Sequence, residues 1–333
     1  MATMKEIAQA AGVSTATVSR VLNGAPLISA ETAARVTAVM QELNYRPNHV
    51  ARSLRTVSTR TLGVLVSNVA NPFFAGLVHS IEDSASDRGL GLILGNASEQ
   101  PDRQLAYLHS FLEKQVDGII ITPTGSDPGW AEEVLARKLP LVFVDRTLTG
   151  VDVPSVTIDD AAALRQLIEH LKSEGHRSAA LITGPTANMP IRHRIAGFVA
   201  AAEALDFAVR PEHIIEGGVS REDGSRAVQK LLALPGERPD VIFTLNNTMA
   251  LGALAELQAA GLSIPRDIAF ASYDDSPWFD VLTPTVTAIA QPVSEMGRAA
   301  VELVSKIIAG EEAGPVALPA TLIIRRSSER ASS

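Results

Sequence analysis

The 333-residue sequence contains no cysteine. This absence excludes disulfide bonds, thiolate metal sites and a cysteine nucleophile, and it fits a cytosolic protein. The sequence also lacks an apolar run long enough to cross a bilayer, and it shows no signal peptide. We therefore expect a cytoplasmic protein without a membrane partner, and we expect neither a metal nor a cofactor.

Motifs of common enzyme classes are missing as well. The sequence contains neither a P-loop nor an HExxH motif. Residues 89–95, GLGLILG, have the glycines of a dinucleotide-binding loop, but apolar residues of a predicted strand separate them. Such a loop requires a turn from strand to helix. We therefore predict that the protein is not an enzyme.

Charge is distributed unevenly along the chain. Residues 1–60 contain seven Lys or Arg and three Glu, a balance of +4, which leaves −12 for the remainder of the net charge of −8. A small basic head on a large acidic body suggests that one end contacts nucleic acid. The length and the 46% apolar content predict two or three globular domains.

The N-terminal segment predicts a helix-turn-helix. A short amphipathic helix is expected from Met4 to Ala11, ended by Gly12, and Ser14 is suited to cap a second helix from Thr15 to Leu22. The second helix carries small and hydroxyl side chains opposite its apolar side. Such side chains let a backbone approach the floor of the major groove, where Thr and Arg can bind base edges. The alternative is the solvated polar face of a small helical bundle.

The rest of the chain alternates strand-like and helical segments. A third head helix is expected over about 31–43, and a short basic helix over 50–54 leads into the body. Strands are expected at 62–67, 91–96, 117–123, 141–145, 179–183, 241–246 and 268–275, with helices at 74–88, 100–114, 130–137, 161–174, 191–205, 223–234 and 248–260. The strand-like runs lack apolar–polar alternation, which indicates strands that are covered on both faces.

The predicted fold class is therefore an all-α helix-turn-helix head followed by an α/β body. The body is too long for one typical sheet. We expect two doubly wound parallel-sheet lobes with a cleft between them.

Motifs along the whole chain resemble the lac-repressor family of bacterial transcription regulators. They are AGVSTATVSRVLNG, ELNYRPNHVARSL, NPFF at 71–74, GP at 184–185, R-x-x-G-F at 194–198, YDD at 273–275 and LTPTVTAIAQP at 282–292. The resemblance implies a helix-turn-helix domain over 1–46, a hinge helix and linker over 47–60, and an effector-binding and dimerisation domain over 61–333. Lobe 1 would span about 61–160 and 291–320, and lobe 2 about 161–290 and 321–330.

The resemblance also implies a double-stranded palindromic operator as partner of a homodimer. The C-terminal tail, IIRRSSERASS, has no leucine heptad, so a tetramerisation helix is not expected. Leu54 would insert between bases in the minor groove, and Arg52 would contact phosphate. The full set of expected DNA-binding residues is Thr15, Ala16, Thr17, Arg20, Asn48, Ala51, Arg52, Leu54 and Arg55.

The body further resembles periplasmic ribose-binding proteins. The matching residues, which we expect to bind the effector, are Ser67, Asn71, Phe73, Phe74, Asp145, Arg146, Arg194, Asn246, Asp274 and Gln291. Carboxylates accept hydroxyl protons, Arg and Asn donate to oxygens, and aromatic rings stack on the C–H face of a sugar. We therefore expect a small sugar, D-ribose or a related pentose, to control operator affinity.

Two positions depart from the pattern of the family. The aromatic residue common near residue 220 is replaced by Val219 or Ser220, and the usual Asn-Asp pair is Asn246-Asn247. One stacking face and one charge are therefore missing. A nucleoside, purine or hexose effector remains the alternative, and a transport-type sugar-binding protein is a remote one.

Overall fold

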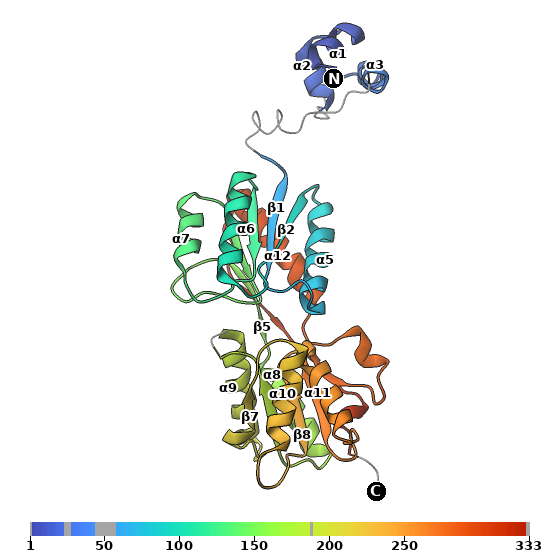
Figure 1. Cartoon of the computed structure of the whole chain (residues 1–333). Helices are drawn as coiled ribbons and strands as arrows, with labels where there is room; N and C mark the ends of the chain where they lie inside the picture. Colours follow the sequence, from blue (N-terminus) through green and yellow to red (C-terminus); the bar gives the residue numbers. More distant parts are fainter. Residues whose placement is uncertain (1, 23–27, 44–57, 187–188, 331–333) are drawn as a thin grey trace. The chain divides into compact units, whose positions relative to one another are not determined.

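The computed structural model describes residues 2–22, 28–43, 58–186 and 189–330 (Figure 1). The chain divides into two compact units, Met1–Thr59 and Arg60–Ser333. The expected hinge helix over 50–54 lies outside the described residues. In the described part of the chain, no helix combines the length and the apolar character that a bilayer-spanning segment requires.

The first unit is a small helical domain. It contains α1 (Met4–Ala11), α2 (Thr15–Leu22) and α3 (Ala30–Glu42). Gly12 ends α1 with a left-handed backbone, φ 66°, which glycine adopts without steric cost. The core of this unit consists of Ile7, Ala8, Ala11, Val18 and Val36, with partly buried apolar residues packed around them.

The second unit has two lobes, and lobe 1 is built on a six-stranded parallel sheet. Its strand order is β11-β5-β4-β3-β1-β2. The strands are β1 (Thr61–Val66), β2 (Gly91–Asn96), β3 (Gly118–Ile121), β4 (Leu141–Val144), β5 (Ser155–Asp159) and β11 (Val316–Pro319). One face packs against α5 (Pro72–Ser86) and α12 (Val293–Ile308), and the other packs against α6 (Pro101–Glu113) and α7 (Gly129–Ala136).

Lobe 2 repeats this arrangement. Its sheet has the order β12-β10-β9-β8-β6-β7, and all pairs are parallel except β10 with β12. The strands are β6 (Ala179–Thr183), β7 (Ile214–Glu216), β8 (Val241–Thr244), β9 (Ala269–Tyr273), β10 (Thr287–Ala290) and β12 (Thr321–Ile323). The covering helices are α8 (Ala161–Ser173) and α9 (Met189–Ala204) on one face, with α10 (Arg221–Leu232) and α11 (Asn247–Ala259) on the other.

The chain passes between the two lobes after β5, after β10 and after β11. The central strands β1, β3, β4, β6, β8 and β9 are almost fully buried because helices cover both faces, as the absence of alternation in the sequence predicts. The carboxyl ends of the strands are the edges at which doubly wound sheets bind ligands. The architecture is the predicted fold class.

Helices α10 and α11 pack unusually closely through two glycines. A Cβ atom added at Gly252 would overlap the carbonyl oxygen of Arg221, and one added at Gly224 would overlap the carbonyl oxygen of Met249. The obstructing atoms belong to backbone, so no change of rotamer can relieve the overlap. The two helices would have to move apart.

We predict that Gly252→Ala destabilises the second unit. Alanine gains about 1 kcal/mol of helix propensity over glycine, but overpacking against the backbone typically costs about 1–3 kcal/mol. Because the overlap is with rigid backbone, the net effect should be a lower midpoint in urea unfolding. Gly314→Ala is the control, since a Cβ there meets no atom within 4 Å. Equal midpoints for the two variants would contradict the prediction.

Candidate ligand pocket and nucleic-acid interface

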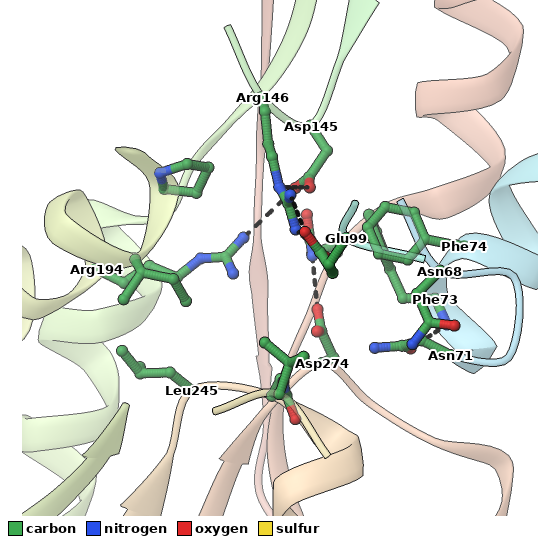
Figure 2. Close-up of a pocket in the computed structure, with 15 residues that line it drawn as sticks. Asn68, Asn71, Phe73, Phe74, Glu99, Asp145, Arg146, Arg194, Leu245 and Asp274 are labelled. Atoms are coloured by element: carbon green, nitrogen blue, oxygen red, sulfur yellow. Dashed lines mark hydrogen bonds and ion pairs between the residues drawn. The ribbon is translucent and has the colours of Figure 1, made fainter. Parts of the chain in front are cut away.

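A pocket opens where loops from the carboxyl ends of strands in both lobes converge (Figure 2). It encloses about 560 Å³ of empty space, part of it open to solvent. Nine of the ten expected effector-binding residues line it: Asn71, Phe73, Phe74, Asp145, Arg146, Arg194, Asn246, Asp274 and Gln291. The structure thus brings together residues that lie up to 220 positions apart in the sequence.

Ser67 is the exception. Its side chain is fully buried, and it does not belong to the pocket lining. Its carbonyl oxygen accepts a hydrogen bond from the backbone N–H of Glu99 at 2.9 Å. Direct contact of Ser67 with an effector stays a prediction.

Two asparagines act both as helix caps and as pocket residues. The Oδ1 atom of Asn71 accepts from the Phe73 N–H at 2.9 Å at the start of α5. In the same way, Oδ1 of Asn246 accepts from the Met249 N–H at 2.7 Å at the start of α11. Because the caps use the oxygen atoms, each side chain keeps its NH₂ group as a donor for a ligand.

Two aspartates occupy equivalent places in the two lobes. Asp145 follows β4 and its N–H donates to Val156 at 2.9 Å, while Asp274 follows β9 and its N–H donates to Ile289 at 2.9 Å. Both have a left-handed backbone, with φ of 66° and 65°. This conformation is uncommon for residues other than glycine and is enriched for Asp, and it turns each carboxylate out of the strand direction.

The carboxylates are strongly buried. Burial raises the pKa of Asp274 to about 6, although the charge of Arg194 and a hydrogen bond from Gln291 act in the opposite direction. That bond joins Gln291 Nε2 to Asp274 Oδ1 at 2.6 Å. Burial also raises the pKa of Asp145 against the opposing charges of Arg194 and Arg146. Both groups are strong hydrogen-bond acceptors when ionised.

Arg194, on α9 of lobe 2, reaches across to lobe 1 (Figure 2). One of its terminal nitrogens is 3.8 Å from Asp145 Oδ1, and its Nε is 3.4 Å from Asp160 Oδ2. Its guanidinium also lies 3.7 Å from the ring centroid of Tyr273, a cation–π contact. Burial opposes the charge, but these acidic groups outweigh it and raise the pKa of Arg194.

Aromatic and apolar side chains complete the wall. Phe73 and Phe74 lie edge to face, with ring centroids 4.9 Å apart. The lining residues that the sequence did not indicate are Asn68, Glu99, Pro190, Ile191, Val219 and Leu245. Val219 occupies the region where family members often carry an aromatic residue. Glu99 comes shortly after the end of β2, and this position beyond a strand end is the one feature of the sequence that could have indicated it as a pocket residue.

The exposed side of α2 fits the expected DNA contact. Thr15, Ala16 and Arg20 are exposed, and Val18 is buried. Thr17 is half-buried. Its hydroxyl forms a hydrogen bond of 2.9 Å with the hydroxyl of Ser14 at the start of the helix. The expected contacts from Asn48, Ala51, Arg52, Leu54 and Arg55 lie outside the described residues.

The fold and the pocket define a two-lobed ligand-binding protein with a helix-turn-helix domain. Residues 59–326 match the family described as "Periplasmic binding proteins and sugar binding domain of LacI family". Residues 3–48 match "Bacterial regulatory proteins, lacI family". The chain belongs to the LacI family and is a DNA-binding transcriptional repressor of that family.

Individual relatives agree on this class. The chain is 36% identical over 312 residues to the HTH-type transcriptional repressor PurR of Aliivibrio fischeri strain ES114, covering 91% of the chain and 90% of the relative. It is also 36% identical over 307 residues to the ribose operon repressor of Escherichia coli K12, covering 91% and 92%. These relatives are transcriptional regulators.

A solved structure supports the architecture. The chain is similar to the lac repressor dimer bound to operator and the anti-inducer ONPF, with a TM-score of 0.86 and 29% identity. The similarity covers 98% of this chain and 99% of that one. The similarity therefore includes both the helix-turn-helix domain and the two-lobed body.

The raised pKa of Asp274 predicts a specific pH dependence of stability. The pKa of Asp274 is about 6 in the folded protein, whereas an Asp in the unfolded chain has a pKa near 4. The folded protein therefore binds this proton more tightly. As the pH rises from about 4 to 6, ionisation of Asp274 lowers the free energy of unfolding of the wild type by a growing amount. Asp274→Asn removes this titration. Between pH 5 and pH 7.5, its free energy of unfolding relative to the wild type should rise by about 1 kcal/mol.

Urea unfolding at the two pH values measures this difference. The exposed Asp152→Asn is the control for the loss of one carboxylate. A relative free energy that is the same at both pH values for Asp274→Asn would show that the carboxyl is not perturbed by burial.

Proposed function

We propose that this repressor acts in the cytoplasm as a homodimer on a palindromic operator, and that a small neutral sugar controls its operator affinity. D-ribose or a related pentose is the proposed effector. The observation that carries this proposal is the convergence of Asp145, from lobe 1, and Asp274, from lobe 2, on one pocket with amide donors beside them.

The hydrogen-bonding groups of the pocket suit a polyhydroxylated ligand. Each sugar hydroxyl can donate to a carboxylate and accept from an amide or guanidinium. The two aspartates supply acceptors, and the NH₂ groups of Asn71 and Asn246 supply donors. Phe73 and Phe74 supply an apolar surface for the C–H face of a ring. This combination is typical of carbohydrate sites.

A purine or nucleoside is the second candidate, and the apolar part of the pocket favours it. Ile191, Val219 and Leu245 line the side contributed by lobe 2 and offer a surface to a flat base. Of the two relatives described above, one is named PurR and the other ribose operon repressor, and both are 36% identical to this chain, so sequence identity does not separate the candidates. The paired carboxylates favour the sugar, because each is an acceptor that a hydroxyl satisfies.

Control of DNA binding would follow from closure of the lobes. A ligand bonded from both lobes favours the arrangement in which all its hydrogen bonds form at once. We propose that closure lowers operator affinity, so the sugar acts as an inducer. Allosteric coupling is typically about 1–3 kcal/mol, which predicts partial rather than complete release of the operator.

Calorimetric titration tests the effector. D-ribose should bind the full chain, and Asp274→Ala should lose most of this affinity, because the ligand hydroxyls are left without their buried acceptor. Asp152→Ala, exposed and outside the pocket, is the matched control. Hypoxanthine and adenosine are titrated in parallel. Binding of either compound without any heat from ribose would exclude the pentose.

A second prediction concerns Arg20. If this exposed residue binds a guanine, Arg20→Ala should cost about 1–3 kcal/mol per site on the operator and less on random DNA. Lys5→Ala, which removes one exposed cation from α1, is the control for charge alone. Fluorescence anisotropy at fixed salt measures both affinities. Equal losses of Arg20→Ala on both DNAs would assign Arg20 to phosphate contact.

A further inference from the structure

Glu99 enters the pocket from a strained turn after β2. Ser98 and Glu99 are consecutive residues with left-handed backbones, at φ of 52° and 56°. Such conformations are uncommon outside glycine and persist where surrounding contacts enforce them. Here the Glu99 N–H donates to the Ser67 carbonyl at 2.9 Å, and the Gln100 N–H donates to Ala97 at 3.0 Å. The turn directs the Glu99 carboxylate toward Arg146 (Figure 2).

Glu99 and Arg146 form a bidentate ion pair. The two terminal nitrogens of Arg146 donate to the two carboxylate oxygens of Glu99 at 2.9 Å and 2.8 Å. The pair is partly buried, with 12% of the Arg146 side chain and 25% of the Glu99 side chain exposed. The remaining nitrogen, Nε, is 3.6 Å from Asp145 Oδ2. All three nitrogens of this guanidinium therefore face protein oxygens.

The second guanidinium of the pocket is occupied as well. Arg194 faces Asp145 and Asp160, at the distances given above. Among the described lining residues, the acidic groups Glu99, Asp145 and Asp274 outnumber the two arginines. A ligand therefore meets strong acceptors and amide donors, while both cations already have carboxylate partners.

We propose that Glu99 is a specificity-determining residue that excludes anionic ligands, such as sugar phosphates and sugar acids, by occupying Arg146. This inference rests on the proposed sugar-binding function of the pocket. Arginine binds phosphate and carboxylate through the same planar fork that Glu99 fills here. An anionic ligand would have to displace Glu99 and leave two like charges beside each other.

The ionisation of Glu99 agrees with this role. Burial raises the pKa of Glu99, but the hydrogen bonds and the charge of Arg146 outweigh it and leave the pKa below its usual value. Glu99 is therefore a carboxylate at neutral pH. A neutral sugar needs no free cation, so the ion pair leaves its recognition by Asp145, Asp274 and the amides intact.

The test compares D-ribose with D-ribose 5-phosphate, using the full chain and titration calorimetry. The wild type should bind the phosphate ester at least about tenfold more weakly than the free sugar. Glu99→Gln keeps the shape of the side chain and removes its charge. It should raise the affinity for the phosphate ester by about tenfold or more, because the freed Arg146 can then form hydrogen bonds to the charged phosphate. Glu99→Asn is a second variant, because Asn tolerates the left-handed backbone.

Two controls isolate the mechanism. Glu133→Gln removes one carboxylate from an exposed ion pair with Arg137 outside the pocket, and it should gain no affinity for the ester. Adding Arg146→Gln to Glu99→Gln should abolish the gain, because the freed guanidinium is its source. A gain that survives in this double variant would overturn the inference.

The outcomes separate this inference from the proposed function. If ribose fails to bind the wild type while Glu99→Gln or Glu99→Asn gains affinity for the ester, the effector assignment fails and the role of Glu99 stands. If ribose binds but neither variant gains affinity for the ester, the role of Glu99 is overturned and the effector assignment stands. Equal wild-type affinity for sugar and ester would also overturn the role of Glu99.

Discussion

The buried charge of Arg194 is the interaction on which the pocket depends. Its guanidinium belongs to lobe 2, yet its partners include Asp145 of lobe 1 and Asp160, where the chain passes between the lobes. The Tyr273 hydroxyl donates to the same Asp160 oxygen at 3.2 Å, so one carboxylate joins the cation and the ring beneath it. A buried charge without partners would be very costly. The relative position of the lobes therefore determines whether Asp145 adds to the partners that Arg194 has on the lobe 2 side.

Much of the fold could be predicted because burial on both faces leaves a clear apolar signature. The runs at 141–145 and 179–183 became β4 and β6. The strands β5, β7, β10, β11 and β12 were not indicated by the sequence. Three of them, β7, β11 and β12, lie at sheet edges, where partial exposure removes the continuous apolar signature. Helix α12 has a clear amphipathic pattern but was not among the expected helices, although the resemblance to the family placed the return of the chain to lobe 1 at about residue 291.

The candidate site was predictable where a residue type matched a known motif at a strand end. Asp145, Asp274 and Gln291 are examples. Ser67 matched the same motif but does not line the pocket, because it lies just beyond β1 with its side chain fully buried. Glu99 could not be found by motif, since its role depends on the unusual backbone of residues 98 and 99 and on a partner 47 positions away.

Asn71 and Asn246 each cap a helix and line the pocket with the same side chain. Replacing a capping asparagine by alanine typically costs about 1 kcal/mol of stability. Any change of ligand preference that acts through these positions is therefore coupled to a loss of helix stability. Val219 and Leu245 line the same pocket without capping a helix. Divergence toward new ligands within this scaffold should thus proceed first through the apolar wall, while the two asparagines remain fixed by the helices that they begin.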